Sequence, residues 1–202
     1  MGSSEPEARL NFVKQKQISK SIIDLPSTAD QRYGVVQYDS YPSVPVRLGY
    51  IRDTKSLKEV IDRIAWRQDG TAFGDALRQA ADQFEKERRP NAEAVLVLYS
   101  DGNTKMTYQE MTEIGSMLRK KGISLRIVTT GEDGEQLKPL APDGITSVNL
   151  TDGITELIRS KIAIGILTGT WKTLEIISRP FIRAKHKKLS VCLSTWGLHS
   201  KR

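Results

Sequence analysis

Apolar and polar positions follow two different periods along residues 10–163, and these two periods alternate with each other. Apolar residues recur at helical spacing over 10–25, 53–66, 73–87, 106–121 and 153–163, and a shorter helix is predicted over 135–140. Between the helices lie short apolar runs typical of strands, over 32–38, 44–48, 94–99, 124–129 and 145–150. Strands separated by helices predict an α/β fold, with a mostly parallel, doubly wound sheet that carries helices on both faces.

Three of these segments carry further detail about burial. In the first helix, which Pro26 ends, the inward face is expected to consist of Leu10, Val13, Ile18, Ser21, Ile22 and Leu25. A proline at position 45 marks 44–48 as an edge strand. The continuous apolar run 94–99 is typical of a strand that is buried on both faces of a parallel sheet.

Two oxygen-bearing side chains stand where such a sheet would bind a ligand. Residues 69–77 form a polar, glycine-bearing loop that runs into a helix and contains Thr71, and the apolar strand 94–99 leads to Asp101. Ligands of open α/β sheets bind at the carboxyl ends of the strands. A threonine hydroxyl and an aspartate carboxylate are hard oxygen ligands of the kind that Mg²⁺ and Mn²⁺ use. Thr71 and Asp101 are therefore candidate metal ligands.

Each of these residues also has a purely structural interpretation. Thr71 could cap the helix that follows it, because its hydroxyl can accept a hydrogen bond from a backbone N–H. Asp101 precedes a glycine, and Asp-Gly is a common turn sequence. Asp69 and Asp75 are interpreted as solvated acids of the loop and of the first helical turn, where negative charge is favourable.

The order of these phrases resembles the von Willebrand factor type A (vWA) family over residues 8–163. The matching phrases are Phe12-Val13-Lys14-Gln15, Gly34-Val35-Val36-Gln37-Tyr38, Gly70-Thr71-x-x-Gly74-x-Ala76-Leu77 and Ser100-Asp101-Gly102. The resemblance implies a doubly wound vWA fold and a metal-ion-dependent adhesion site, in which Thr71 and Asp101 match two ligands of Mg²⁺ or Mn²⁺. It further implies a non-enzymatic, extracellular module that binds matrix or cell-surface proteins, with an acidic residue of the partner completing the coordination of the ion.

The sequence departs from the family at its beginning. The family's first ligand motif, Asp-x-Ser-x-Ser, is missing, and Gly2-Ser3 or Ser3-Ser4 could be its remnant. The strand before this motif is central in the family's sheet, so we expect that central strand to be missing, cation binding to be weak or lost, and the exposed sheet edges to favour self-association. The chain would then be a fragment, an alternative isoform or the product of an incompletely assigned gene. An alternative is that the strand-like residues 189–195 fill the gap in a permuted topology.

The charge of the chain is unevenly distributed. Residues 165–202 contain eight basic residues and one acidic residue, which accounts for the whole net charge of +7, while residues 1–164 are neutral. We therefore expect a vWA-like domain over 1–164 and a disordered basic tail over 165–202. A neutral domain argues against nucleic acid as a ligand, although an intracellular vWA-like scaffold whose tail binds nucleic acid through the basic cluster 183–188 is an alternative.

Several classes of protein are excluded or disfavoured. The single cysteine, Cys192, excludes an internal disulfide, and no apolar run is long enough to span a membrane. Both histidines lie outside 1–164 and there is no glycine-rich phosphate loop, so the chain is not expected to be an enzyme. The N-terminus lacks the pattern of a secretory signal, so the chain is expected to be intracellular or a fragment of a secreted parent. Asn149-Leu150-Thr151 would be a glycosylation site only in the secretory pathway.

Overall fold

The computed structural model describes residues 5–24, 31–67, 70, 72–100, 104–129, 132–141, 145–147 and 188–196. Helices and strands alternate, in the order α1 (Glu5–Ile23), β1 (Gln31–Tyr38), β2 (Pro42–Val46), α2 (Thr54–Arg63), α3 (Phe73–Glu87), β3 (Ala92–Ser100), α4 (Tyr108–Lys120), β4 (Ile123–Thr129), the 3₁₀ helix η1 (Glu132–Leu137), β5 (Ile145–Ser147) and β6 (Lys188–Trp196). The elements agree in type with the periodicity of the sequence. The helix expected over 153–163 lies outside the described residues.

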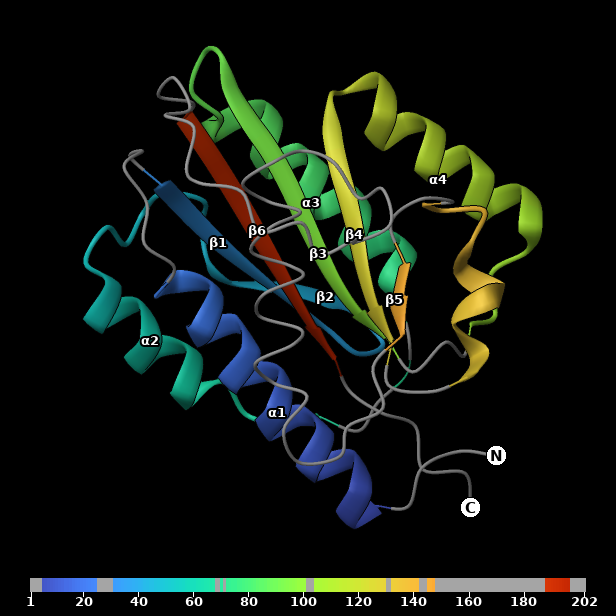
Figure 1. Ribbon diagram of the computed structural model, residues 1–202, viewed down its shortest axis with the longest axis horizontal. Helices are drawn as coiled ribbons and strands as arrows, with labels where there is room; N and C mark the ends of the chain where they lie inside the picture. The colour runs from blue at the N-terminus through green and yellow to red at the C-terminus, as the bar shows by residue number, and fades with distance from the viewer. Residues whose placement is uncertain are drawn as a thin grey trace, which may run out of the picture.

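One sheet of six strands organises the domain, with the strand order β2-β1-β6-β3-β4-β5 (Figure 1). The strands β1, β6, β3, β4 and β5 are parallel to their neighbours, and β2 pairs antiparallel with β1 at one edge. The edge position of β2 is the one that its internal proline predicts, because proline cannot donate to a hydrogen-bonded ladder. The predicted α/β fold with a mostly parallel, doubly wound sheet is confirmed.

The strand β6 holds the position between β1 and β3 that was expected to be vacant. It is parallel to both neighbours, and its register runs from Gln31↔Leu189 to Tyr38↔Trp196 on one side and from Ala92↔Lys188 to Leu98↔Ser194 on the other. Residues 188–196 therefore belong to the sheet and not to a separate tail. The topology is the permuted alternative, in which the central strand comes from the C-terminal part of the sequence. Residues 165–187 and 197–202 lie outside the described residues.

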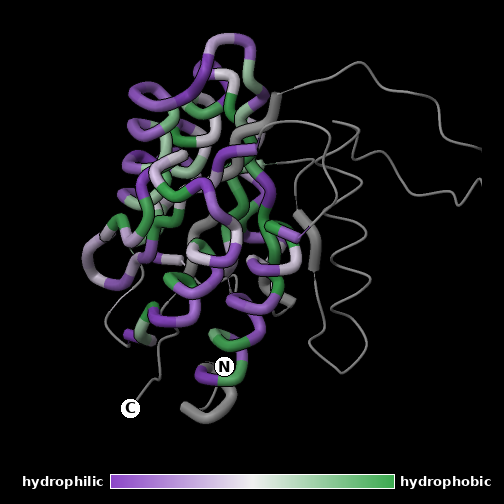
Figure 2. The backbone as a smooth tube through the Cα atoms, turned by 90° about the vertical axis from the view of Figure 1, so that its left-hand side faces the viewer, coloured by the Kyte–Doolittle hydropathy of each residue, from purple (hydrophilic) through white to green (hydrophobic). Residues whose placement is uncertain are grey.

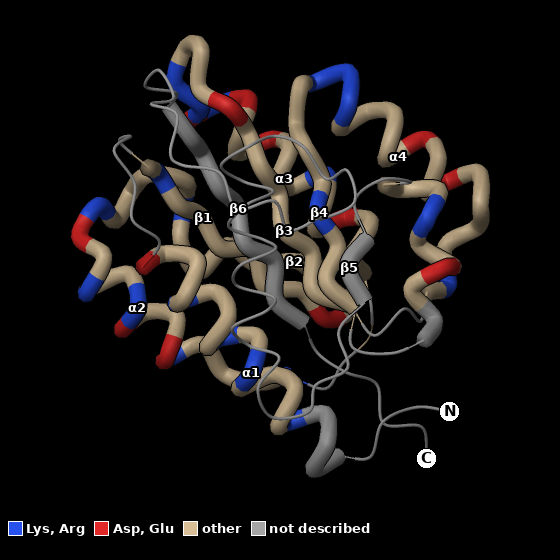
Figure 3. The backbone as a smooth tube through the Cα atoms, viewed as in Figure 1, with Lys and Arg blue, Asp and Glu red and all other residues tan. Residues whose placement is uncertain are grey.

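Helices cover both faces of this sheet (Figure 1). The helices α1 and α2 contact each other on one face, and α3 and α4 contact each other on the opposite face. Hydrophobic positions follow the strands and the inner sides of the helices, whereas the outer turns are largely hydrophilic (Figure 2). Lys, Arg, Asp and Glu accordingly lie mainly on the helices and loops (Figure 3). This distribution is that of a three-layer α/β domain with a core on each side of the sheet.

The two helices α2 and α3 bury the faces that their sequences predict. In α3 the buried positions include Leu77, Ala80, Ala81 and Phe84, which recur every three or four residues. In α2, Leu57 and Ile61 are buried and Asp53 caps the N-terminus by accepting a hydrogen bond from the backbone N–H of Ser56. Among the described residues, no helix combines the length and the apolar character that a membrane crossing requires.

The buried face of α1 differs from the prediction. Ile18 and Ile22 are buried as expected, but Leu10 is 52% exposed and Val13 is 46% exposed. The buried face of the helix instead includes three polar residues, which lie three or four positions apart and in line with Ile22: Asn11, Gln15 and Ser19. Phe12 and Ile23 are buried beside them. The prediction failed because it followed apolar residues alone, whereas a polar side chain can be buried when it is hydrogen-bonded, as Ser19 is at 3.2 Å from the hydroxyl of Tyr99.

Candidate functional site

The carboxyl ends of the central strands define the candidate site. The register of β1, β6 and β3 brings Tyr38, Trp196 and Ser100 to the same edge of the sheet. Three described segments lie next to these strand ends: residues 39–41 after β1, residues 70 and 72 before α3, and residues 104–107 before α4. This is the place at which an open α/β sheet binds its ligands.

The residues before and after Thr71, Gly70 and Ala72, both contact the segment that follows β1. The backbone N–H of Ala72 donates to the carbonyl oxygen of Asp39 over 2.7 Å. Gly70 has a φ of 83°, and a Cβ at this position would lie 2.5 Å from the hydroxyl oxygen of Ser40. Only glycine fits without strain, because the backbone is left-handed and Ser40 approaches closely. Thr71 itself lies outside the described residues.

The end of β3 is fully buried, and the segment before α4 packs against α3. Ser100 is 0% exposed at the end of β3, and Asp101, Gly102 and Asn103 lie outside the described residues. The chain is described again from Thr104, whose hydroxyl accepts a hydrogen bond from the N–H of Met106 over 3.0 Å. The sulfur of Met106 packs against Gly74 in the first turn of α3. The structure thus brings the residues flanking Thr71 and Asp101 to one edge, while the two side chains remain outside the description.

A carboxylate that the sequence reasoning missed lies at the same edge. Asp39 follows β1 directly, and its side chain is only 10% exposed. One carboxylate oxygen lies 3.3 Å from a guanidinium nitrogen of Arg67, and the other accepts a hydrogen bond from the N–H of Tyr41 over 2.8 Å. The signal that identified Asp101, a carboxylate after a predicted strand, applies equally to Asp39. Both oxygens of Asp39 are engaged within the protein, so the residue fixes the loop after β1.

The acids on either side of the loop were interpreted as solvated residues. Asp75 is exposed in the first turn of α3 and forms an ion pair with Arg78, with 3.2 Å between the carboxylate oxygen and the guanidinium nitrogen. The interpretation is confirmed for Asp75, whereas Asp69 lies outside the described residues.

Buried aromatic residues form a rigid base behind this edge. The hydroxyl of Tyr38 donates to the carbonyl oxygen of Tyr99 over 2.9 Å, and the rings of Tyr38 and Phe73 meet edge to face with their centroids 6.4 Å apart. Burial raises the pKa of the Tyr99 phenol, whose oxygen lies beside the hydroxyl of Ser19. The end of β1, the end of β3 and the start of α3 are therefore joined through fully buried side chains.

Two tyrosines extend into solvent from the loops at this edge. Tyr41 is 79% exposed just after β1, and Tyr108 is 73% exposed at the start of α4. Large aromatic side chains that are exposed beside a rigid edge are typical of surfaces that bind other proteins, because they supply contact area at a small cost in conformational entropy.

The described residues do not by themselves fit a divalent cation. Among them, no group of three His, Cys, Asp or Glu side chains could hold a metal ion. Asp39, the carboxylate at the edge that is described, already uses both oxygens on Arg67 and Tyr41. Mg²⁺ requires several well-placed oxygens, and the described residues at this edge do not supply them.

The comparisons with known proteins agree with this fold. The von Willebrand factor type A domain family matches residues 2–159, and the chain belongs to this family. Domains of the family act in general as protein-interaction modules and not as enzymes. No curated protein matches the sequence.

Solved structures of vWA domains share the fold at low identity. Proximal thread matrix protein 1 from the mussel byssus is 20% identical with a TM-score of 0.63, over 77% of this chain and 40% of its own, so the present chain spans about two fifths of that protein. A vWA protein from Catenulispora acidiphila is 20% identical with a TM-score of 0.65, over 80% of this chain and 40% of its own. Manganese-loaded TRAP protein from Plasmodium vivax is 16% identical with a TM-score of 0.57, over 76% of this chain and 66% of its own.

Proposed function

We propose that this chain is an adhesion-type module that binds an extracellular protein, of the matrix or of a cell surface, through the carboxyl edge of its sheet. The exposed pair Tyr41 and Tyr108 on a rigid, buried base is the observation that carries the proposal. Membership of the vWA family supports it, and so does the likeness to a byssus matrix protein. Aromatic anchors of this kind commonly supply the largest single contributions to a protein–protein interface.

The two tyrosines provide the test of this function. Binding of the chain to a panel of immobilised matrix proteins, collagens included, is measured by surface plasmon resonance. We expect Tyr41→Ala combined with Tyr108→Ala to weaken binding at least about tenfold, because losing two aromatic anchors removes roughly 1–2 kcal/mol each. Tyr50→Ala is the matched control, since Tyr50 is 82% exposed but follows β2 near the opposite edge. Equal losses in the control, or no binding to any panel member, would refute the proposal.

We further propose that Thr71 and Asp101 are the ligands that this chain retains at a cation site, and that Mg²⁺ or Mn²⁺ binds there only weakly. Asp39, the described carboxylate at this edge, already uses its two oxygens on Arg67 and on the N–H of Tyr41. A single aspartate and hydroxyl ligands are a poor set for a hard dication, which needs charge and several fixed oxygens. Protein binding at this edge then does not require the ion.

Thermal unfolding measures the strength of this site. The chain is melted in EDTA and then in 1 mM Mg²⁺ or Mn²⁺, followed by circular dichroism. A dissociation constant of about 1 mM or weaker stabilises the fold by at most roughly 0.4 kcal/mol, which raises the midpoint by about 1–2 °C. Asp101→Ala is expected to remove this small shift. A rise above about 5 °C, or a shift that survives Asp101→Ala, would contradict the weak site.

A further inference from the structure

The strand β6 is joined to the rest of the sheet by a connection that is longer than its position requires. Residues 148–187 lie between β5 and β6, 40 residues in all. A crossover between parallel strands needs only about a dozen residues. A stretch of 40 residues can span up to about 130 Å, whereas the six strands, at a spacing of about 4.8 Å, are about 25 Å wide. The length of the connection therefore allows β6 to reach a second copy of the chain.

The position that β6 occupies is bounded by contacts in which β6 takes no part. At the carboxyl end, the hydroxyl of Tyr38 in β1 donates to the carbonyl oxygen of Tyr99 in β3 over 2.9 Å, and the ring of Tyr38 meets that of Phe73 in α3. The helices of one face also link the two halves of the sheet, since α3 contacts β1 and β2, and α4 contacts α3 and β4. These contacts hold β1 and β3 two strand spacings apart, about 9–10 Å.

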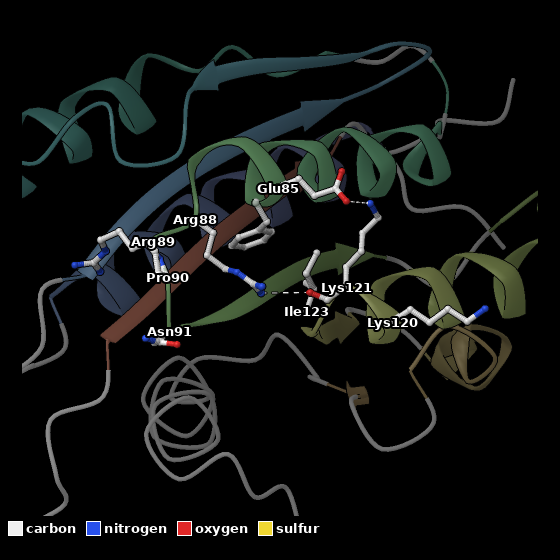
Figure 4. A pocket seen from close by; sticks show the side chains of 9 residues that line it. Glu85, Arg88, Arg89, Pro90, Asn91, Lys120, Lys121 and Ile123 are labelled. Atoms are coloured by element: carbon white, nitrogen blue, oxygen red, sulfur yellow. Dashed lines mark hydrogen bonds and ion pairs between the residues drawn. The ribbon is translucent and has the colours of Figure 1, made fainter.

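The amino end of β3, where β6 begins opposite Ala92, is fixed in the same way. The N–H of Ala92 donates to the carbonyl oxygen of Arg89 over 3.1 Å, which closes the turn before β3. The guanidinium of Arg88 donates to the carbonyl oxygens of Lys121 and Gly122, at 3.3 and 3.4 Å, and so ties this turn to the start of β4 (Figure 4). The strand β3 is therefore positioned at both ends by contacts that do not involve β6.

The same pairing of β6 is available from another copy of the chain. In the structure, β6 is parallel to β1 over eight residue pairs and to β3 over seven. Residues 188–196 of a second copy would form the same two ladders in the same register, so an exchange would cost the sheet none of its strand pairing. Each copy holds one such position and one such strand. Reciprocal exchange therefore closes as a two-fold symmetric dimer and leaves neither β1 nor β3 with an unpaired edge at this position.

We propose that two copies of this chain exchange β6, so that residues 188–196 of each copy lie between β1 and β3 of the other. The exchange takes place when many chains fold together, because the position between β1 and β3 is then open to the strand of a second copy. In dilute solution each chain uses its own β6, since that strand is tethered close to its position. This self-association does not depend on the adhesion function proposed for the carboxyl edge.

Refolding of the full chain at two concentrations tests whether copies pair. The chain is refolded from guanidinium at about 2 µM and at about 200 µM, and size-exclusion chromatography with light scattering measures the share of dimer. We expect this share to be at least about fivefold larger at the higher concentration, because capture by a second copy is bimolecular and pairing within one chain is not. The isolated dimer should persist when it is diluted to about 2 µM, because its separation requires β6 to leave both ladders. A weak surface contact would dissociate.

A disulfide between two different chains shows which strand is exchanged. One full chain carries Ala92→Cys and the other carries Lys188→Cys, and both carry Cys192→Ser so that no other thiol is present. Residues 92 and 188 are in register on neighbouring strands, so their Cα atoms are about 4.8 Å apart, a distance that a disulfide can bridge. The two chains are mixed, refolded at the higher concentration and oxidised. We expect a covalent heterodimer on a non-reducing gel.

Two controls separate strand exchange from random contact and from misfolding. Ser190→Cys takes the place of Lys188→Cys in the register control, because residue 190 pairs with residue 94 and its Cα lies about 8 Å from that of residue 92. Cys192→Ser alone should melt within about 2 °C of the unsubstituted chain, and Cys192→Ala replaces it if it does not. The proposal is overturned if the chain is monomeric at both concentrations, if the dimer dissociates on dilution, or if the register control forms as much covalent heterodimer.

Discussion

Truncation of the chain after residue 187 is expected to abolish cooperative unfolding, because it removes β6 from the middle of the sheet. The strands β1 and β3 each pair with β6 over nearly their whole length. Without it, their facing N–H and C=O groups lose their partners, and each buried group left unpaired costs about 1–3 kcal/mol. A few such groups equal the entire net stability of a typical domain, about 5–15 kcal/mol. Circular dichroism during heating should show a broad loss of signal.

A truncation after Trp196 is the matched control, since it removes residues 197–202 and keeps β6 intact. This variant should melt cooperatively with a midpoint close to that of the full chain. Hydrogen exchange gives a second readout, because the amides of β1 and β3 should lose protection in the shorter variant only. A cooperative melt of the 1–187 chain at the original midpoint would show that β1 and β3 do not depend on β6.

Among glycine-to-alanine substitutions at the carboxyl edge, Gly70→Ala is expected to lower the free energy of unfolding the most. The left-handed backbone at φ 83° costs a non-glycine residue about 1–2 kcal/mol. The added Cβ would also lie 2.5 Å from the hydroxyl oxygen and 3.0 Å from the backbone of Ser40, so the loop must move away from β1. We expect a total loss of about 2–4 kcal/mol in the free energy of unfolding by chemical denaturation, together with weaker binding of the protein ligand at this edge.

Gly122→Ala separates the two contributions. Gly122 has a φ of 66°, and the nearest atom to an added Cβ is a guanidinium nitrogen of Arg88 at 3.7 Å, which is ordinary contact. This variant should lose only the backbone contribution, about 1–2 kcal/mol, and should keep its affinity for the protein ligand. Equal losses of stability in the two variants would mean that the approach of Gly70 to Ser40 does not constrain the loop.

The sequence predicts a helix or strand well where the burial of apolar side chains alone determines which residues face inward. The inward residues of α3 and the doubly buried run of β3 follow directly from apolar spacing. The face of α1 could not be predicted this way, because Asn11, Gln15 and Ser19 are buried polar residues, and Ser19 bonds to Tyr99, 80 residues away in the sequence. The placement of β6 was foreseen only as an alternative, since strand order depends on long-range pairing that no local pattern records.

The candidate site was predicted in outline and not in detail. The rule that ligands bind at the carboxyl ends of parallel strands placed the segments around Thr71 and Asp101 at one edge, and the structure places their flanking residues there. Asp39 was missed although it obeys the same rule, and its role in holding the loop depends on Arg67, 28 residues away. The exposure of Tyr41 and Tyr108 could not be read from periodicity, because both lie in or beside loops.

The position of β6 also determines the order in which the domain can form. Of the six strands it is the last in the sequence, 41 residues beyond the end of β5, yet it lies between β1 and β3. A nascent chain that has exposed every other strand still lacks the one that joins the two halves of the sheet, so the domain cannot complete itself until residue 196 has left the ribosome. Pairing between such distant segments slows folding. Until β6 is in place, β1 and β3 each have an unpaired edge that is exposed to other chains. At about 5–20 residues per second, the sheet stays incomplete for about 2–10 s after β5 has been synthesised.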